Sequence, residues 1–562
     1  MTSSIERASS SADFAFGLFR LAGVAVVVFL ATSGAWMEEL PARLMAVSVL
    51  TFAWLLATGT FGLATVRRDD WLLAPILALA LIVRLTLVRP GNSEITLYFP
   101  VAGFDGGWFA DKHSMVYDAW KAAFVSLWGS SHAEFAVLNG VVGALAVVPL
   151  YLFVRHRFDD RLAAALAAVL FSVHPLIARY APTDAHYSLI LLFLFCGLAF
   201  LADGRDWQQV FAGLVCLGIA GGLRMEAGAY AAVSLLLVRW RVILSRLRSE
   251  SSVRAAALAG SLLAIALTIG NFATKRSSWG PEVTQHADWG APITALLGGP
   301  YQRWFVGPLF DSAQAGDGLL VMLFWVGVLA SVVAYRFRVG LLAVVAAVVL
   351  STVVLHADVV TWPAVARRFN VVWALQCVVG GVGIAWLLEF LPARRSQHAA
   401  AAALACGIAA IIPAWHLAEL RREYAFNTEY DLVRNYVEAR RDSAPCTLFY
   451  FNDGDLGLNN PADVVLGVEA RNCAEQDCMP HVREGKCRYL LKGIGCALRG
   501  TAPELRQGRA LKDLCDEFLA AVRTRPLAER SVDFVEAYGA PAPAGKFPPS
   551  GQIGIYEVLG AR

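Results

Sequence analysis

The sequence predicts an all-α polytopic membrane protein of about thirteen transmembrane helices, followed by a C-terminal α/β domain that bears disulfides outside the membrane. The first observation is composition: 57% of the 562 residues are hydrophobic and only 17% are charged, against about 45–50% and about 25% in soluble domains. The second is a series of apolar runs close to the roughly 20 residues that cross a bilayer. The third is the crowding of cysteines after the last of these runs.

Charge and the first residues exclude two further classes. The formal net charge is +3 and there is no basic tail, so we expect no nucleic-acid partner. The N-terminal segment MTSSIERASSSADFAFG is polar, and no cleavage site follows a short apolar core. The first apolar run is therefore expected to stay in the chain as a span and not to be a signal peptide.

The apolar runs divide the chain into three parts. Residues 1–70 hold an N-terminal pair of spans, residues 71–415 hold the main transmembrane domain, and residues 416–562 form a soluble domain. The candidate spans are Phe16–Trp36, Leu44–Val66, Trp71–Val88, Phe135–Val154, Leu162–Ile177, Leu189–Ala202, Val210–Leu223, Gly228–Val238, Ala255–Thr274, Leu319–Tyr335, Val339–Leu355, Asn370–Phe390 and Ala399–Trp415.

Arginine-rich short loops predict the orientation, because Lys and Arg concentrate in cytoplasmic loops. They follow the second, fourth, eighth, tenth and twelfth spans, which puts them all on one side together with the N-terminus. The long polar loops 89–134 and 275–318, and the C-terminal domain, then lie outside. The arginines are Arg67, Arg68, Arg155, Arg157, Arg161, Arg239, Arg241, Arg246, Arg248, Arg254, Arg336, Arg338, Arg394 and Arg395.

The tail is typical of one small α/β domain. TLFYF, RYLLKG and IGIYEVLG predict strands, and APELRQGRALKDLCDEFLAAV predicts a helix. An even number of cysteines in so small a domain predicts two or three disulfides and an oxidising compartment. A zinc site is the alternative, but the paired CxxC spacing is missing. The cysteines are Cys446, Cys473, Cys478, Cys487, Cys496 and Cys515.

The first outer loop contains an unusual stretch, GFDGGWFADKHSMVYDAWKAAF, from Gly103 to Phe124. Its apolar residues recur at helical spacing, which predicts a helix lying on the membrane surface with Trp and Phe at the boundary. The polar face carries Asp111 and Asp118 among other residues. The simplest interpretation is an interfacial anchor, and the functional one is a helix that holds acids over the membrane.

Three other outer turns carry charge. Asp184 begins the sixth span, and Arg224 lies two residues before Glu226 in GLRMEAG. Arg367 and Arg368 lie at the outer end of the twelfth span, against the positive-inside trend. An N-cap, a local ion pair or a snorkelling Arg are the structural alternatives. Together these groups suit a phosphate at the lipid surface, held by Arg, and a hydroxyl whose proton a carboxylate accepts.

The order of these segments resembles a known group of enzymes. The motifs are a span ending in LALALIVRLTLV, an outer-loop acid before YDAWKAAF, then LAAVLFSVHPLIARYAPTDAHYSLILLFLFCGLAFLA, GLRMEAG and ARRFNVVWALQ, across residues 71–390. As a set they resemble the GT-C-type integral membrane glycosyltransferases, in the branch of protein O-mannosyltransferases and aminoarabinose (lipid A) transferases. That family usually carries Asp-Glu in the first loop, whereas this chain has Asp111-Lys112.

The resemblance implies a GT-C-like domain in the bacterial inner membrane, with the tail in the periplasm. It implies inverting transfer of a sugar from a polyprenyl-phosphate donor to a hydroxyl of a glycolipid, polysaccharide or protein. Asp111 would be the general base and Asp184 the second acid. No cofactor is required; a divalent metal is an unsupported alternative, because the second acid of the loop is missing. The expected donor-binding residues are Arg224, Arg367, Arg368, Glu226, Lys112, Tyr117 and His186.

Two other classes of function stay open from the sequence. A transporter or lipid flippase would place charges near the bilayer midplane, often within inverted repeats. Here no internal repeat is visible, and Arg84 is the main charge within a span. A non-catalytic envelope scaffold would use the tail to bind a partner and leave the outer acids dispensable. The sequence contains no glycine-rich phosphate loop or dinucleotide fingerprint.

Overall fold

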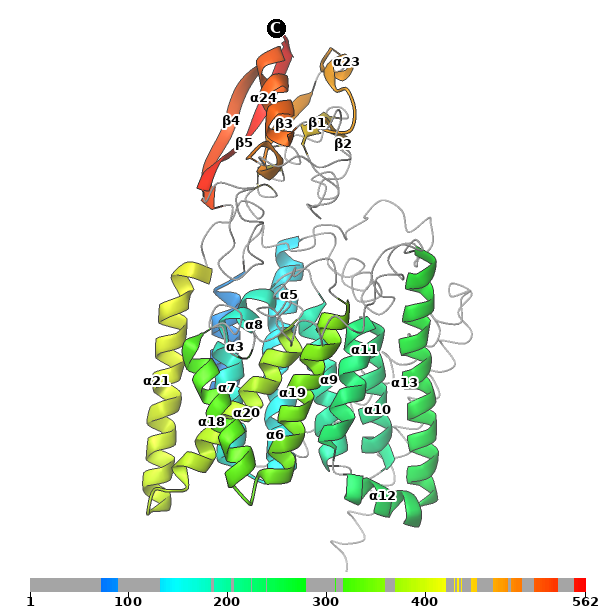
Figure 1. Ribbon diagram of the computed structural model, residues 1–562, viewed down its shortest axis with the longest axis vertical. Coiled ribbons are helices and arrows are strands. Elements are labelled where there is room, and N and C mark those ends of the chain that lie inside the picture. The colour runs from blue at the N-terminus through cyan, green and yellow to red at the C-terminus, as the bar shows by residue number, and fades with distance from the viewer. Residues whose placement is uncertain are drawn as a thin grey trace, which may run out of the picture.

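A helical bundle and a five-stranded sheet make up the part of the chain that the computed structural model describes (Figure 1). That part comprises residues 72–88, 132–182, 186–203, 207–223, 225–238, 240–278, 309, 317–358, 369–420, 429, 432–433, 436, 446–451, 468–483, 487–497, 510–533 and 550–562.

Each predicted span from Trp71–Val88 onward lies mostly on one helix or on two successive helices of the structure. The two earlier spans, and the surface helix expected in Gly103–Phe124, lie outside the described residues. The bundle consists of α3 (Leu73–Leu85), α5 (His132–Leu145), α6 (Val147–Phe158), α7 (Arg161–Val173), α8 (Pro175–Tyr180), α9 (Tyr187–Asp203), α10 (Trp207–Leu223), α11 (Met225–Ser234) with η4 (Leu235–Leu237), α12 (Trp240–Ser249), α13 (Ser251–Ser278), α18 (Gly318–Val333), α19 (Arg338–Asp358), α20 (Asn370–Leu388) and α21 (Arg394–Leu420).

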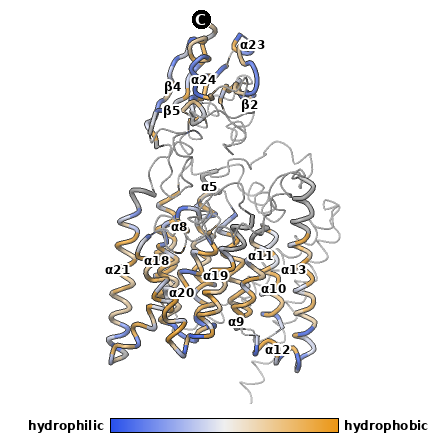
Figure 2. The backbone as a smooth tube through the Cα atoms, in the orientation of Figure 1, coloured by the Kyte–Doolittle hydropathy of each residue, from blue (hydrophilic) through white to orange (hydrophobic). Residues whose placement is uncertain are grey.

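The bundle has the lengths and apolarity of a membrane protein. Among the described residues, four helices are long and apolar enough to cross a membrane, or up to five if the bent pair Ala227–Leu237 and Trp240–Ser249 is one span. Shorter apolar helices of 10–17 residues accompany them. Figure 2 shows apolar residues along the bundle and hydrophilic ones at its ends. The count of about thirteen spans, and the side on which the tail lies, stay predictions.

The predicted span Leu162–Ile177 is divided in the structure. α7 ends at Val173, His174 has a ψ of 117°, and Pro175 opens the short helix α8. Proline lacks an N–H and disfavours helical backbone at the residue before it, so the helix stops there. The end of the bundle at which α8 lies is named the α8 end from here on (Figure 1).

The arginine-rich stretch after the eighth span was expected to be a loop, and this was wrong. It contains α12, which is bent by 84° from the preceding helix. Figure 1 shows α12 at the end of the bundle opposite α8, named the α12 end. The search for apolar runs does not predict this helix, because its ten residues are too few and too polar for a span.

Small residues let the central helices approach one another closely. A Cβ atom at Gly381 would lie 2.4 Å from the backbone nitrogen of Ala167, and one at Gly327 would lie 2.2 Å from the carbonyl oxygen of Val379. α20 therefore packs against α7 on one side and α18 on another. Close backbone approach of this kind is how helices associate in lipid, where burial of apolar surface gives little drive.

The C-terminal sheet has the strand order β2-β1-β3-β5-β4, parallel among the first three strands and antiparallel for the rest. The predicted strands are β1 (Cys446–Tyr450), β3 (Arg488–Lys492) and β5 (Ser550–Ala561), and the predicted helix contains α24 (Leu511–Ala521). β2 (Val468–Asn472) and β4 (Val522–Asp533) were not predicted, nor was the short helix α23 (Met479–Val482). β4 contains Pro526 and many charges, which an edge strand tolerates at an irregularity.

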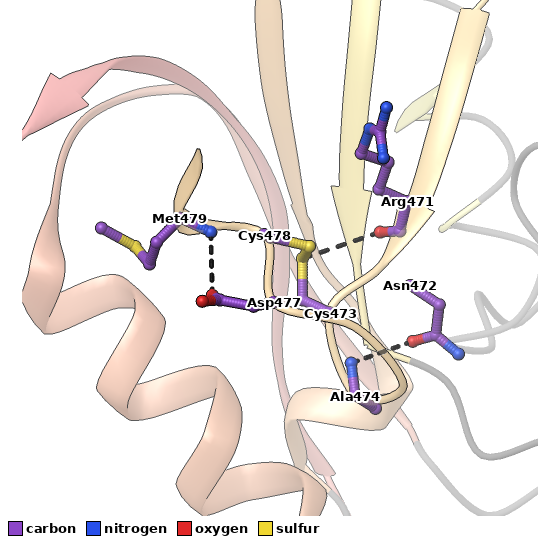
Figure 3. The surroundings of a disulfide bond; sticks show 7 residues. All are labelled: Arg471, Asn472, Cys473, Ala474, Asp477, Cys478 and Met479. Carbon is purple, nitrogen blue, oxygen red and sulfur yellow. Dashed lines mark hydrogen bonds between the residues drawn. A yellow bond between two sulfur atoms is a disulfide. The ribbon is translucent and has the colours of Figure 1, made fainter. Parts of the chain in front are cut away.

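The six tail cysteines form three disulfides, as predicted: Cys446–Cys487, Cys473–Cys478 and Cys496–Cys515. Figure 3 shows the short loop that Cys473–Cys478 closes after β2. At the two ends of this loop the backbone N–H of Ala474 donates to Asn472 Oδ1 (3.2 Å) and that of Met479 donates to Asp477 Oδ1 (3.1 Å). The other four cysteines, Cys196, Cys216, Cys377 and Cys406, lie in helices of the bundle.

Candidate functional site

Most of the predicted site lies outside the described residues. The residues outside them are Asp111, Lys112, Tyr117, Asp184, Arg224, Arg367 and Arg368. Glu226 lies in α11, but its side chain is not described. His186 is the predicted site residue whose side chain is described. The structure thus describes the framework that adjoins these turns, and the roles assigned to them stay predictions.

The helix ends that adjoin the charged turns share one end of the bundle. α9 and α10 are antiparallel: Gly197 contacts Leu217, and Gly213 contacts Leu201. The start of α9 and the end of α10 therefore lie together. α10 continues after one residue into α11, and Figure 1 shows the top of α11 at the α8 end.

α5 supports the segment that runs from α8 into α9. A Cβ at Gly140 would lie 3.3 Å from Pro182 Cβ, and one at Gly143 would lie 2.7 Å from Ala181 Cβ and 2.8 Å from Ser188 Oγ. Ser188 Oγ also donates to the carbonyl of Ala181 (3.2 Å). Ala181 and Ser188, which precede and follow position 184 in the chain, are thus held against each other and against α5.

His186 is buried at the start of α9. Its ring centroid lies 4.8 Å from that of Tyr187, and its carbonyl accepts from Ile190 N (3.0 Å). The side chain is only 3% exposed. The structure therefore describes His186 as packed among its neighbours, and its expected role in binding the donor stays a prediction.

Arg84 is fully buried in the last turn of α3 and holds the break between α7 and α8. Its Nη1 donates to the carbonyls of Ser172 (3.1 Å) and Ala80 (3.3 Å), and its Nη2 donates to the carbonyl of Phe171 (3.3 Å). Helix ends leave carbonyls without partners, and Pro175 has no N–H to give to Phe171. Arg84 thus supplies the donors that the break requires, and its guanidinium lies 5.2 Å from the Phe171 ring centroid.

Aromatic stacking fixes α8 against the start of α20. The fully buried Trp373 ring is stacked with His174 (5.5 Å between centroids) and with Tyr180 (6.2 Å, 6° between planes). Arg179, also in α8, is buried with its guanidinium 5.7 Å from the Tyr180 centroid. Since α20 begins two residues after Arg368 in the chain, this stack joins two helix ends that adjoin turns marked by the sequence.

Asp317 and His416 form a pair that the sequence analysis missed. Asp317 caps α18, since its Oδ1 accepts from Leu319 N (2.6 Å). Its Oδ2 is hydrogen-bonded to Nε2 of His416 in α21. The Asp before an apolar run was a usable N-cap signal, but nothing in the sequence indicates that α21 would bring a histidine to it.

The environment of Asp317 has opposing effects on its pKa, and the net effect lowers it. Partial burial raises the pKa by disfavouring the charged carboxylate. The hydrogen bonds from His416 and Leu319, with the nearby charges of His416 and His174, lower it by more. The carboxylate is therefore the preferred form in this setting.

No group of three or more His, Cys, Asp or Glu side chains suited to a metal ion occurs within the described part of the chain. Asp111 and Asp184 lie outside that part, so the expectation about a metal or cofactor is untested.

Comparisons with known proteins give matches of fold alone. Neither a protein-family model nor a curated protein sequence matches the chain. The chain is similar to the apo structure of ArnT from Cupriavidus metallidurans, at 12% identity and a TM-score of 0.49, over 86% of this chain and 97% of that one. It is also similar to the apo oligosaccharyltransferase of Archaeoglobus fulgidus (12%, TM-score 0.43, 82% of this chain and 70% of that one).

A further similarity is to the oligosaccharyltransferase AglB from Archaeoglobus fulgidus, in complex with an inhibitory peptide and a dolichol-phosphate (11%, TM-score 0.41, 82% of this chain and 70% of that one).

Proposed function

We propose that this chain is an inverting glycosyltransferase. It moves a hexosyl or pentosyl group from a polyprenyl-phosphate donor to an acceptor hydroxyl at the outer face of the membrane. The observation that supports the proposal is the shared α8 end: α8, the start of α20, the start of α9 and the end of α10 adjoin the turns that bear the acid and the arginines. To act on a lipid-linked donor, the side chains that bind the phosphate and activate the acceptor must lie together at one membrane surface.

Asp111 is the proposed base. Its carboxylate accepts the proton of the acceptor hydroxyl, whose oxygen forms a bond to the anomeric carbon from the face opposite the phosphate. The bond between that carbon and the phosphate oxygen breaks, and its electron pair leaves with the polyprenyl phosphate. Attack opposite the leaving group inverts the anomeric configuration. Asp184 is the proposed second acid of the site.

The arginines are proposed to hold the donor. Arg224, Arg367 and Arg368 offer planar, permanently charged groups that bind phosphate oxygens in pairs. The charge on the phosphate increases as the sugar leaves, so these side chains stabilise the transition state more than the ground state. Glu226, Lys112, Tyr117 and His186 are proposed as further donor contacts.

The hydrogen bonds of Arg84 favour an enzyme over a transporter. A transporter would use an intramembrane charge to bind its cargo. Arg84 instead contacts the carbonyls of Ala80, Phe171 and Ser172, which is a structural use of the charge. The acceptor class, whether glycolipid, polysaccharide or protein, is left to experiment.

The test is sugar transfer by purified Asp111→Asn protein, with polyprenyl-phosphate sugars as donors. Asn keeps the shape and removes the basicity, so turnover should fall by about 10²–10⁴-fold. Donor affinity should change little, whereas Arg367→Ala should weaken it. Asp118→Asn, on the same predicted helix, is the matched control. If Asp111→Asn matches wild type at equal thermal stability, the helix is an anchor and the catalytic role is wrong.

A further inference from the structure

α12 carries an amphipathic surface that the proposed reaction does not use. With 3.6 residues per turn, Trp240, Ile243, Leu244 and Leu247 fall on one stripe of this helix. Ile243 is buried and Leu247 packs against the bundle core. Trp240 and Leu244, at the other edge of the stripe, are 43% and 46% exposed. The stripe is therefore wider than the surface that the bundle covers.

Two arginines flank the exposed edge. Arg241 and Arg248 lie on the same side of the helix, about two turns apart with Leu244 between them along the axis, and both are exposed. Within the described residues neither makes an ion pair, whereas Arg246 lies 3.9 Å from Glu250. The exposed surface of α12 is thus an apolar edge, Trp240 and Leu244, next to two cationic side chains. It is named the α12 edge.

The helix that follows the α12 edge has an exposed apolar side of its own. α13 follows α12 directly, and exposes Leu258, Leu262, Ile265 and Ile269 along one side, each more than half accessible. The 84° bend before α12 turns the chain away from the axis of the bundle. Trp240 Nε1 donates to the carbonyl of Leu235 (2.8 Å), which fixes the ring at the corner. Figures 1 and 2 show α12 at the end of the bundle, with hydrophilic residues at its ends.

We propose that the α12 edge binds anionic phospholipid. Trp240 and Leu244 enter the boundary between headgroups and acyl chains, and Arg241 and Arg248 contact headgroup phosphates. Charge complementarity selects the anionic class: two exposed arginines beside an apolar edge match a negatively charged headgroup above acyl chains. By the arginine distribution of the sequence this is the cytoplasmic leaflet, and the proposal does not depend on the glycosyltransferase activity.

The test is hydrogen exchange of residues 241–249 in the full-length protein. Nanodiscs of phosphatidylcholine alone are compared with discs of equal parts phosphatidylcholine and phosphatidylglycerol. Each basic residue near an anionic surface strengthens membrane binding by about fivefold. With two arginines, amide exchange of α12 should therefore be roughly 10- to 30-fold slower in the anionic discs than in the neutral ones. Arg241→Gln with Arg248→Gln should abolish this difference. Leu244→Ser should speed exchange in both discs.

Matched arginines at the same end of the bundle serve as the control. Arg338 and Arg395 are exposed beside other spans, and Arg338→Gln with Arg395→Gln should leave the lipid response of α12 intact. Three results would overturn the proposal: equal exchange of wild-type α12 in both discs, a full response in the Arg241/Arg248 variant, or loss of the response in the control. Protection of α12 only when another protein is added would assign the edge to a protein partner instead.

Discussion

Arg84 shows how one side chain sets the geometry of a helix break. A proline within a transmembrane run leaves carbonyls without donors, and lipid supplies none. In soluble proteins water would fill that role. Here a fully buried guanidinium from a different helix does so, and it ties α3 to the end of α7. The charge is tolerated because it is spread over five donors and lies against the Phe171 ring.

We expect Arg84→Met to lower the thermal stability of the bundle clearly. Met fits an apolar site but leaves the carbonyls of Phe171 and Ser172 without donors, at a cost of about 1–3 kcal/mol for each. The measurement is the thermal midpoint by circular dichroism in detergent. Arg338→Met, at an exposed site, should stay within about 0.5 kcal/mol of wild type. Equal midpoints for the two variants would show that the Arg84 hydrogen bonds are not needed at the break.

The Asp317–His416 pair makes stability depend on pH. The folded pKa of Asp317 lies below that of an unfolded Asp, about 3.9. Its contribution is therefore fully present above about pH 4 and is lost as pH falls through the lower folded pKa. Asp317→Asn keeps a capping side chain and removes the charge.

The measurement is the thermal midpoint of wild type and Asp317→Asn across acidic pH. The wild type should be the more stable above about pH 4, and the difference should shrink below it. A difference that stays constant down to the lowest pH would mean that the carboxylate charge contributes nothing.

At the scale of elements, helix contacts through glycine explain why α20 packs closely against both α7 and α18. Gly381 and Gly327 bring α20 within backbone distance of both neighbours. The apolar runs alone predict these helices but not their partners, because nearly every residue in them is apolar. Which face meets which neighbour depends on where small residues coincide across two helices.

We expect Gly381→Ala to push α20 away from α7. The added methyl would lie 2.4 Å from the backbone nitrogen of Ala167, and a backbone atom cannot move aside as a side chain can. Overpacking of this kind costs about 1–3 kcal/mol. Gly407, in α21, is the control, since a Cβ there meets nothing within 4 Å. Gly407→Ala should be neutral or stabilise the protein by up to about 1 kcal/mol. Equal thermal midpoints for Gly381→Ala and Gly407→Ala would contradict the close contact between α20 and α7.

At the scale of the whole molecule, two independent patterns predict the orientation. Arginine-rich turns predict one side as cytoplasmic, and the disulfides of the tail predict an oxidising compartment for the other. The sheet and the α8 end lie toward the same side in Figure 1, with α12 opposite. Orientation itself is a prediction that labelling can test.

A membrane-impermeant thiol reagent should label a cysteine placed at Ser130 or Gln302 in intact cells. It should miss one placed at Ser245, which is exposed on α12. The background should be Cys406→Ser, because Cys406 is the exposed free thiol of the described bundle. Ser245 should become reactive only after the membrane is permeabilised. Labelling of Ser245 in intact cells would reverse the orientation and remove the outer site with it.

Local patterns in the sequence determined the membrane class, the spans from residue 71 onward, three strands and a helix of the tail, and the use of all six tail cysteines. These features depend on composition and short-range periodicity. The break at His174 was readable from Pro175, but α12 was hidden by its polarity and β4 by its charges, since an edge strand need not alternate.

Only the tertiary structure decided the cysteine pairing, the Arg84 contacts, the Trp373 stack and the Asp317–His416 pair. Except for the Cys473–Cys478 disulfide and the contact of Arg84 with Ala80, these interactions join residues far apart in the chain. A local sequence pattern carries no information about which distant segment will lie beside it. The candidate acids and arginines were marked by charge in apolar surroundings. What the structure adds is that the helix ends beside them share one end of the bundle, because antiparallel helices of similar length return the chain to the same surface.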